Sequence, residues 1–533
     1  MDSVVDIPDA IFVLSGDTAK PAWRHADRFG APGVDITLRT SSDRLAIGVS
    51  APTQQLSRIV LRWRRPMPAN ALVLGDAWER GYGDLQWRSL QPERILPWSW
   101  LAYDPATGRT WGAGVRVRPA TFCSWRVDED GVSLWLDLRN GGGPVRLGSR
   151  VLPAATVVSV EGEPDESPLS VQRRLAAEMC LDPIPSAGPV VGCNNWYYAY
   201  GVDFTPAHIL RDADMIATLA GGHAVRPFTV VDAGWSAGGG APGGPWQDGL
   251  PGVFDDMPGL AGKITDRGSR PGIWIRPTAL SFVDDPDRLR AGPHTSKEKP
   301  LDITTPENLE SVRSAIQLLR GWGFELIKHD FSTFDAFGRF GDTMGDTLTE
   351  SGWHWHDESL TNAEILLRLY GVIREAAGDA VVIGCNTVGH LAAGLVDVQR
   401  VGDDTSGRQW ERTRRMGVNS LAFRLAQHGT FFTVDADCVP ATPVTPWEKN
   451  RQFLDLVARS GTALMVSVDP AARNPAVDAD LRAALRIALD GGEPGGVEPL
   501  DWMASTSPRH WRVGDSTRTY DWLEESGALP LGG

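Results

Sequence analysis

The sequence contains little cysteine and no excess of basic residues. Its five cysteines, Cys123, Cys180, Cys193, Cys385 and Cys438, lie far apart and form no C-x-x-C pair. A disulfide framework is therefore not expected, and a reducing cytoplasm is the expected compartment. The 52 lysines and arginines are outnumbered by 67 aspartates and glutamates, which gives a formal net charge of −15. This acidic balance argues against nucleic acid and anionic membranes as partners, because both normally leave a basic patch.

Long apolar runs and metal-binding spacings are also missing from the sequence. No apolar run approaches the ~20 residues that a membrane-spanning helix needs. The first nine residues have no basic segment followed by an apolar one, so no secretory signal is expected. His354 and His356 stand close together, but no third ligand at a suitable spacing accompanies them. We therefore expect neither a metal site nor a membrane partner.

Tyrosine is scarce, whereas tryptophan is abundant. The chain has 21 Trp against 16 Phe and 7 Tyr. Large flat rings with a single N–H group stack well on the apolar faces of sugars, but they also fill cores and interfaces. The composition alone therefore leaves sugar binding, core packing and a homo-oligomer open.

The first 185 residues have the pattern of a β-sandwich. Segments that begin at Arg58, Val132 and Ala155 alternate apolar and polar residues with a period of two, and turn-forming clusters such as 140–144 separate them. This pattern is typical of antiparallel strands with one buried face. We predict an antiparallel β-sandwich domain over 1–185, with a helical pattern only from Ser170 onward.

The pattern changes after about residue 186, where compact apolar runs alternate with amphipathic helical stretches. The expected strands are Val190–Cys193, Phe228–Asp232, Gly272–Arg276, Leu326–Asp330, Ala380–Cys385, Val396–Val401, Phe431–Asp435 and Ala463–Val468. The expected helices are Pro206–Leu219, Pro306–Trp322, Asn362–Ala377, Arg408–Gln427, Thr445–Ser460 and Asp478–Leu489. Eight such units predict a (β/α)8 TIM barrel over 186–490, with a doubly wound open sheet as the alternative. Residues 491–533 predict a small C-terminal β-rich segment.

Active sites of such barrels lie at the C-terminal ends of the strands. The polar and aromatic side chains expected there are Asn194, Asn195, Trp196, Asp232, Trp235, Trp274, Arg276, Lys328, Asp330, Asn386, Arg400, Asp403, Asp404, Asp435 and Asp437. Carboxylates are over-represented, and no Ser-His-Asp arrangement appears. Two carboxylates from different strands are what cleavage of a glycosidic bond requires, one as nucleophile and one as acid and base.

Asp330 and Asp404 form the best pair of carboxylates. They are 74 residues apart, which places them at the ends of the fourth and sixth strands. Lys328 lies two residues before Asp330, on the same face, and would lower the pKa of that carboxyl group as a nucleophile requires. Any one strand-end aspartate is more simply explained as a helix cap. The whole constellation favours a catalytic site.

Five segments of the barrel resemble glycoside hydrolases of clan D. These segments are Gly-Cys-Asn-Asn-Trp from Gly192, Val-Asp-Ala-Gly-Trp from Val231, Pro-Gly-Ile-Trp-Ile-Arg-Pro from Pro271, Ile-Lys-His-Asp-Phe from Ile327, and Arg-Val-Gly-Asp-Asp-Thr from Arg400. The chain resembles family 36 most closely, which contains α-galactosidases and raffinose-synthase-like enzymes. The resemblance covers about 190–470.

The resemblance implies a role for each matching residue. Asp330 would be the nucleophile of a retaining double displacement, and Asp404 the acid/base, with the adjacent Asp403 as the alternative. Further residues would bind the substrate: Lys328 and Arg400 through sugar hydroxyls, Trp196 and Trp274 as walls, and Asp232 through outer hydroxyls. Apart from the resemblance, the strand-end positions of Trp235, Arg276 and Asn386 make them candidate substrate-binding residues as well. Neither a metal nor another cofactor is implied.

One position departs from the family pattern. Many members carry two adjacent acids at the end of the second strand, where they contact the 4- and 6-hydroxyls of the sugar, but here the second position is Ala233. We predict a retaining exo-α-glycosidase acting on an oligosaccharide or glycoside, with α-galactosidase as the leading activity. The alternatives are an enzyme for glucose, a 2-acetamido sugar or a modified sugar, a transglycosylase, and a non-catalytic carbohydrate-binding protein.

Overall fold

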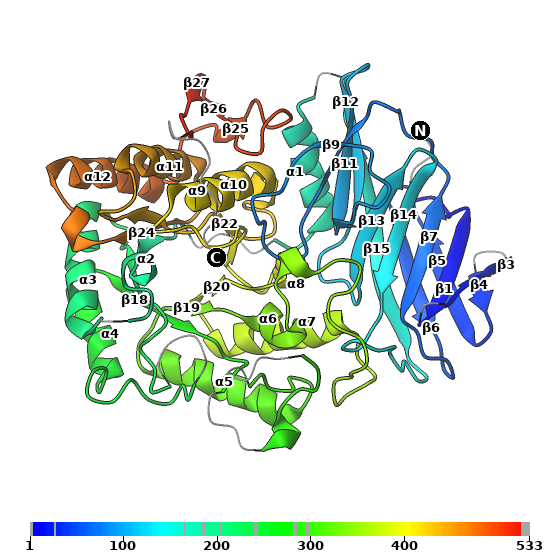
Figure 1. The fold of residues 1–533 in the computed structure, drawn as a ribbon, viewed down its shortest axis with the longest axis horizontal. Helices are drawn as coiled ribbons and strands as arrows, with labels where there is room; N and C mark the ends of the chain where they lie inside the picture. Colours follow the sequence, from blue (N-terminus) through cyan, green and yellow to red (C-terminus); the bar gives the residue numbers. More distant parts are fainter. Residues whose placement is uncertain are drawn as a thin grey trace.

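The computed structural model describes residues 4–16, 18–25, 28–164, 166–183, 188–202, 204–238, 244–280, 285–293 and 299–523. Figure 1 shows a β-sandwich on one side (blue to cyan), a barrel with its helices beside it (green to orange), and a small sheet (red) above the barrel helices. The sandwich, barrel and small C-terminal sheet expected from the sequence are therefore confirmed.

The sandwich consists of two antiparallel sheets. Their strand orders are β10-β13-β14-β7-β1-β2 and β3-β4-β5-β6-β15-β12-β11-β8-β9. The strands are β1 (Ala10–Ser15), β2 (Thr18–Pro21), β3 (Trp23–His25), β4 (Arg28–Ala31), β5 (Val34–Thr40), β6 (Arg44–Ser50), β7 (Arg58–Trp63), β8 (Leu72–Gly75), β9 (Arg88–Ser89), β10 (Leu96–Pro97), β11 (Ser99–Asp104), β12 (Arg109–Val115), β13 (Phe122–Asp128), β14 (Gly131–Asp137) and β15 (Val151–Glu161).

The period-two pattern buries one face of each sheet. In β6, for example, Leu45, Ile47 and Val49 are buried, whereas the residues between them are partly exposed. Trp100 of one sheet and Trp125 of the other meet edge to face, with ring centroids 6.5 Å apart. Much of the tryptophan in this half of the chain therefore packs the core between the two sheets.

The barrel strands run parallel in sequence order from β16 to β22, and β24 pairs with β16 on the other side. The strands are β16 (Val191–Asn194), β17 (Phe228–Val231), β18 (Arg270–Ile275), β19 (Leu326–His329), β20 (Val381–Gly384), β21 (Val398–Arg400), β22 (Thr433–Asp435), β23 (Val439–Ala441) and β24 (Leu464–Val468). A parallel bridge between Asp435 and Ala463 joins β22 to the start of β24. The ring is thereby closed. Each of the eight expected strands is present, with its ends within two residues of the expected ones.

Helices cover the outside of the ring. The α-helices are α1 (Pro168–Met179), α2 (Trp196–Ala199), α3 (Pro206–Ala220), α4 (Met257–Asp266), α5 (Pro306–Gly321), α6 (Ser332–Phe337), α7 (Asn362–Ala377), α8 (Gly389–Ala392), α9 (Trp410–Thr413), α10 (Asn419–Arg424), α11 (Trp447–Ser460) and α12 (Pro475–Leu489). Short turns of 3-10 helix are η1 (Pro286–Arg288), η2 (Gly341–Thr343), η4 (Leu425–Gln427) and η5 (Pro470–Ala472). None of the helices in these described segments is long and apolar enough to cross a membrane.

The long helix expected over Arg408–Gln427 is not continuous. A π-helical segment, η3 (Arg414–Val418), lies between α9 and α10. Gly417 packs so closely against the ring of Phe453 that a Cβ atom would lie 2.4 Å from it, and the Ser420 hydroxyl donates to the Met416 carbonyl one turn back. Such a bulge shifts the register of the helix and is frequent near functional sites. Helix α4 was not expected from the sequence.

The C-terminal sheet consists of β25 (Val497–Pro499), β26 (His510–Val513) and β27 (Ser516–Thr519), paired antiparallel. It lies against the barrel helices, where Trp410 donates through its indole N–H to the Trp522 carbonyl. Residues 524–533 of the expected C-terminal segment lie outside the described residues.

One buried carboxyl group gives the fold a pH-dependent stability. Asp212 on α3 is 4% exposed and accepts a hydrogen bond from the Tyr198 hydroxyl. Burial raises its pKa to about 7, against the opposing effects of Tyr198 and Arg211. Between pH 4 and 7 the folded state therefore holds a proton that the unfolded state has released, so this group makes the folded state less stable as the pH rises.

We expect the neutral replacement Asp212→Asn to remove this dependence. The free energy of unfolding of the variant, minus that of the wild type, should increase from pH 5 to pH 8. The expected increase is up to a few kcal/mol, because each unit of pKa shift corresponds to about 1.4 kcal/mol. Thermal unfolding at the two pH values measures the difference. Equal offsets at pH 5 and pH 8 would contradict the prediction.

Candidate active site

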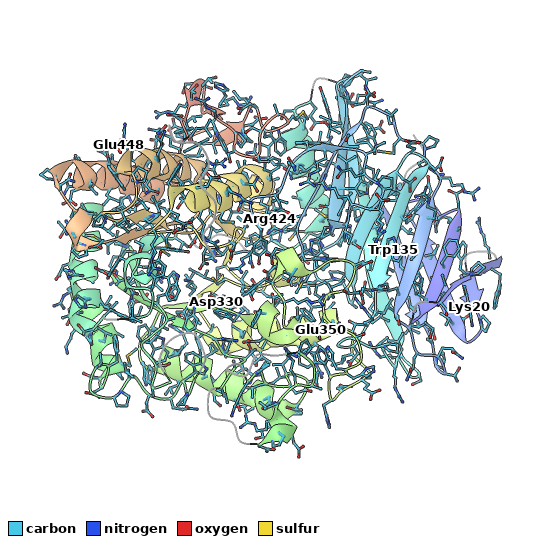
Figure 2. The ribbon with its side chains drawn as sticks, in the orientation of Figure 1. Lys20, Trp135, Asp330, Glu350, Arg424 and Glu448 are labelled. Atoms are coloured by element: carbon cyan, nitrogen blue, oxygen red, sulfur yellow. The ribbon has the colours of Figure 1, made fainter. Side chains whose placement is uncertain are left out.

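A cavity of about 490 Å³ opens at the C-terminal ends of the barrel strands. Figure 2 labels Asp330 near the centre of the barrel. The residues that line the cavity are Arg80, Tyr82, Trp196, Asp232, Ala233, Trp274, Lys328, Asp330, Phe331, Phe340, Asp342, Arg400, Asp403, Asp404, Arg412, Arg415 and Met416. Charged side chains of both signs therefore surround the cavity, together with several aromatic rings.

Asp330 directly follows β19, and both of its carboxylate oxygens are held. Oδ1 accepts a hydrogen bond from the Phe331 amide at 2.7 Å, and Oδ2 accepts one from the Trp274 indole N–H at 3.1 Å. Phe331 has a φ of 62°, a left-handed conformation that is uncommon for a bulky residue and is frequent at functional sites. This backbone turn aims the carboxylate into the cavity.

The charges around Asp330 keep it ionised. Burial by itself raises the pKa of this carboxyl group, but Lys328, Arg80 and Arg400 outweigh burial and hold the pKa below its usual value. Lys328 points to the same side as Asp330, as alternation along a strand requires, and its ammonium lies 2.7 Å from Asp232 Oδ2 at the end of β17. Asp330 is therefore a carboxylate at neutral pH, as a nucleophile must be.

Asp404 lies beyond the end of β21 and is partly exposed. Its side chain is 39% exposed, and it accepts a charge-assisted hydrogen bond from Arg400, whose own side chain is 2% exposed. Arg80 lies 3.9 Å from the same oxygen. Burial raises the pKa of Asp404, but Arg400 and Arg80 overcome this effect and hold the pKa well below its usual range.

The sandwich domain contributes directly to the cavity through the loop 76–85, which we call the Glu79 loop. The amide of Gly81 donates to the Val401 carbonyl at 2.8 Å, and the amide of Asp403 donates to the Gly81 carbonyl at 2.9 Å. This strand-like pairing brings Arg80 within 3.1 Å of Asp403. A residue from the first domain thus becomes part of the wall beside Asp404.

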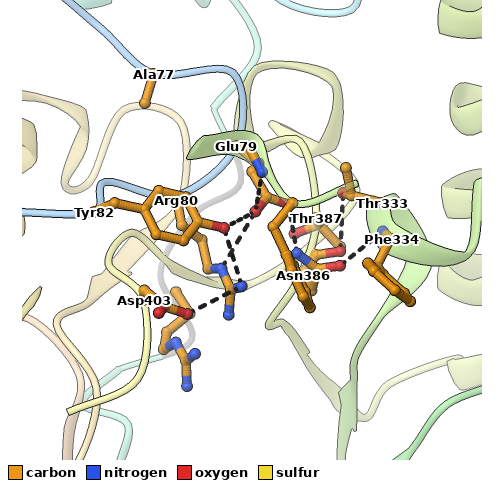
Figure 3. Close-up of polar contacts among 12 residues, drawn as sticks. Ala77, Glu79, Arg80, Tyr82, Thr333, Phe334, Asn386, Thr387 and Asp403 are labelled. Atoms are coloured by element: carbon orange, nitrogen blue, oxygen red, sulfur yellow. Dashed lines mark hydrogen bonds and ion pairs between the residues drawn. The ribbon is translucent and has the colours of Figure 1, made fainter. Parts of the chain in front are cut away.

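Glu79 is a fully buried carboxylate at the centre of this loop (Figure 3). It accepts hydrogen bonds from the Tyr82 hydroxyl, from the Asn386 side-chain amide and, at 3.0 Å, from the Gly341 amide. Its partner charge is Arg80, 3.6 Å away. Glu79 therefore ties the loop to the end of β20 and to the segment after α6.

The two ends of the Glu79 loop are held by the barrel as well. Arg424 on α10 pairs with Asp76 at 2.7 Å and donates to the Ala77 and Glu79 carbonyls. Asn419, one turn earlier on α10, exchanges two hydrogen bonds with the backbone of Leu85. The buried side chains of Arg424 and Asn419 thus hold both ends of the loop, so the loop has one defined position.

Eight of the eleven site residues predicted from the sequence line the cavity. They are Trp196, Asp232, Trp274, Lys328, Asp330, Arg400, Asp403 and Asp404. The other three lie behind it. Trp235 is buried and donates to the Trp274 carbonyl, Arg276 pairs with Asp335 and stacks over the Phe331 ring at 4.3 Å, and Asn386 binds Glu79. These three support the wall of the cavity and do not face into it.

Other segments bring further residues to the cavity that were not predicted from the sequence. They are Arg80 and Tyr82 of the Glu79 loop, Phe331, Phe340 and Asp342 around α6, and Arg412, Arg415 and Met416 around η3. Phe331 directly follows a predicted strand end, so its position was the one available signal. The others depend on loops whose place in the fold no periodicity indicates.

Known structures share the arrangement of this chain. No protein-family model matches the chain. An α-galactosidase from Thermus thermophilus in complex with p-nitrophenyl α-D-galactopyranoside has a TM-score of 0.60 at 18% identity, and the match covers 96% of this chain and 99% of that one. A family 36 α-galactosidase from Geobacillus stearothermophilus in complex with 1-deoxygalactonojirimycin has a TM-score of 0.57 at 12% identity, covering 91% and 72% of the two chains.

A further structure of the Thermus thermophilus enzyme, in complex with stachyose, gives a TM-score of 0.57 at 19% identity and covers 90% of this chain and 99% of that one. The chain has the fold of glycoside hydrolase family 36. The resemblance expected from five short segments is thus confirmed at the level of the fold.

The position of the Glu79 loop should depend on the Glu79 carboxylate. Glu79→Ala leaves three donors without their acceptor: the buried Asn386 amide and the partly buried Tyr82 hydroxyl and Gly341 amide. The loss of a buried partner costs about 1–3 kcal/mol, and the loss of a partly buried one costs less. We expect a lower unfolding temperature and a loop that no longer holds Arg80 beside Asp403. Thermal unfolding and fluorescence of the single-site variant measure the first effect.

Tyr82→Phe is the matched control, because it removes only one donor to the same carboxylate. It should lose much less stability than Glu79→Ala. Equal stability of Glu79→Ala and the wild type would show that the loop does not depend on this carboxylate.

Proposed function

We propose that the protein is a retaining exo-acting α-glycosidase, with α-galactosides as its leading substrates. The observation that carries this proposal is the presence of Asp330 and Asp404 in one cavity, beyond the ends of β19 and β21, with Lys328 and Arg400 as their nearby cations. The fold shared with α-galactosidases supports the same reaction class.

In the proposed reaction, Asp330 attacks the anomeric carbon while Asp404 gives its proton to the departing glycosidic oxygen. A covalent glycosyl-aspartate forms as the glycosidic bond breaks. Asp404, now a carboxylate, then takes a proton from water, and the oxygen of that water attacks the same carbon and releases Asp330. Two displacements restore the original configuration of the sugar.

The charge of Asp404 must change during this cycle. In the free site the carboxylate is paired with Arg400 and is ionised at neutral pH. The acid role therefore requires the bound sugar to weaken this pair, by accepting hydrogen bonds from the Arg400 guanidinium with its hydroxyls. Water removed by the bound sugar further favours the neutral form of the carboxyl group.

The end of β17 bears on the choice of sugar. Asp232 is fixed by Lys328 and by the side-chain amide of Asn194 at 2.5 Å, and the adjacent cavity-lining residue is Ala233. A second carboxylate at 233 would accept hydrogen bonds from the outer hydroxyls of galactose. Its absence makes an α-glycoside of a different or modified sugar the second candidate substrate.

We expect the wild type to turn over p-nitrophenyl α-D-galactopyranoside with retention, measured by release of nitrophenol and by NMR of the first-formed sugar. Asp330→Ala should lower kcat/KM by roughly 10⁴-fold, because the covalent route is lost. Added azide then distinguishes the two carboxylates. Asp330→Ala should yield the β-galactosyl azide, and Asp404→Asn should yield the α-galactosyl azide.

Asp403→Asn is the matched control, because Asp403 is the neighbouring carboxylate and lines the same cavity. If Asp403→Asn, and not Asp404→Asn, yields the α-galactosyl azide, Asp403 is the acid/base. A wild type that is inert on the galactoside and on a panel of other α-glycosides would overturn the proposed function.

The substitution Ala233→Asp tests the sugar preference. An added carboxylate at the end of β17 supplies an acceptor for galactose hydroxyls, so the ratio of kcat/KM for the α-galactoside to that for the α-glucoside should rise by about tenfold or more. Ala233→Leu, which adds a side chain of similar size without an acceptor, should not raise the ratio. An unchanged ratio in Ala233→Asp would mean that this position does not face the distinguishing hydroxyls.

A further inference from the structure

The buried carboxylate of Asp437 lies behind Asp404 and is not used in the proposed reaction. Asp437 follows β22 by two residues, has a side chain that is 4% exposed, and is not among the residues that line the cavity. Its φ is 72°, a left-handed conformation that an aspartate adopts at a cost in conformational energy. The surrounding contacts hold it there, and such local strain is concentrated at functional sites.

Asp437 contacts two residues beside Asp404, namely Arg400 and Thr405. Oδ1 lies 3.1 Å from Nη1 of Arg400, and the other amino group of that guanidinium binds Asp404. Oδ2 accepts hydrogen bonds from the Thr405 amide at 2.8 Å and the Thr405 hydroxyl at 3.0 Å. The Tyr197 hydroxyl on α2 also donates to Oδ2. One carboxylate thus connects the ends of β16, β21 and β22.

Arg400 therefore serves two carboxylates at once. Its side chain is 2% exposed, and its Nε donates to the Gly402 carbonyl at 3.0 Å, so the guanidinium is held on three sides. Because one positive charge is shared, Asp437 reduces the part of it that stabilises the anion of Asp404. A neutral side chain at 437 would leave the whole charge to Asp404.

The other charged and titratable groups that face this pair come from several elements. They are Arg80 of the Glu79 loop, Lys328 and Asp330 at the end of β19, Cys385 after β20, Asp435 on β22, Cys438 beyond β22 and Tyr197 on α2. Asp435 accepts a hydrogen bond from the Asp437 amide at 2.8 Å, and burial raises its pKa to about 7. None of these groups contacts both Arg400 and Thr405 in the described residues.

We propose that Asp437 is a positioning residue for the acid/base: it holds Arg400 and Thr405 in place and, by sharing Arg400, keeps Asp404 able to take up a proton. The proposal rests on the proposed function. It predicts that the loss of the negative charge at 437 impairs the proton-donating step and leaves the attack by Asp330 largely intact.

The experiment compares two leaving groups in the wild type and in Asp437→Asn. Dinitrophenolate departs without a proton, whereas the sugar alcohol of raffinose requires one. We expect kcat/KM for raffinose at pH 7 to fall by about tenfold or more, and kcat/KM for 2,4-dinitrophenyl α-galactoside to change less than about twofold. In the pH profile of kcat/KM for raffinose, the alkaline limb should move to lower pH. The reason is that more of the positive charge of Arg400 then stabilises the Asp404 anion.

Two further variants separate charge from packing. Asp437→Gly also removes the charge and relieves the left-handed backbone, so it provides a folded test if Asp437→Asn is unstable. It should show the same dependence on the leaving group. Tyr197→Phe removes one hydrogen bond to Oδ2 but keeps the charge, and its alkaline limb should stay where that of the wild type lies.

The outcomes are distinct. Equal losses on both substrates in the charge-removing variants, with an unmoved alkaline limb, would overturn the positioning role and leave the proposed function standing. A wild type that turns over neither galactoside and none of a panel of other α-glycosides would overturn the proposed function and this inference with it. If the wild type turns over a different α-glycoside, the same two leaving groups are compared with dinitrophenyl and alkyl glycosides of that sugar.

Discussion

The arrangement at the mouth of the barrel is governed by the need to pair buried charges. Arg400 and Arg80 are buried and Lys328 is largely so, with side chains 2%, 5% and 13% exposed, and each lies within 4 Å of at least one carboxylate. An unpaired buried charge costs several kcal/mol, so removal of any member leaves its partners unstable. The network therefore contributes little to the free energy of unfolding, but it fixes the ionisation state and the orientation of each side chain. Those are the properties that a site built on two carboxylates needs.

The same constraint makes the barrel dependent on the sandwich. Asp403 pairs with Arg412 from the barrel and, at 3.1 Å, with Arg80 from the sandwich domain. Arg80 reaches the cavity because the Glu79 loop pairs with the backbone beyond β21. Glu79 and Arg424, whose side chains are buried, hold that loop through hydrogen bonds. A barrel without the sandwich would leave Asp403 with one cation fewer, and the wall beside Asp404 incomplete. The two domains therefore form one site.

The sequence predicts this site wherever local pattern decides the structure. Compact apolar runs locate each strand to within two residues, and parallel strands bring their ends together, so Asp330 and Asp404 could be paired without coordinates. Local pattern does not say which side of a strand end faces the cavity, and Arg276 and Trp235 therefore turned out to lie behind it. Nor does it reveal where a distant loop docks. Arg80 and the bulge at Arg414–Val418 depend on tertiary contacts alone.

The separation of roles among the strands has a consequence for specificity. The carboxylates proposed for bond cleavage stand on β19 and β21, with their cations, whereas Ala233 stands at the end of β17 and has no charge to pair. A change at 233 would alter the hydrogen bonds available to the outer hydroxyls, at a strand end separate from the contacts of Arg400 with Asp404, Asp437 and Gly402. The chemistry of cleavage can therefore stay constant while the preferred sugar changes. This is why the fold and the paired carboxylates support a reaction class more strongly than a galactose substrate.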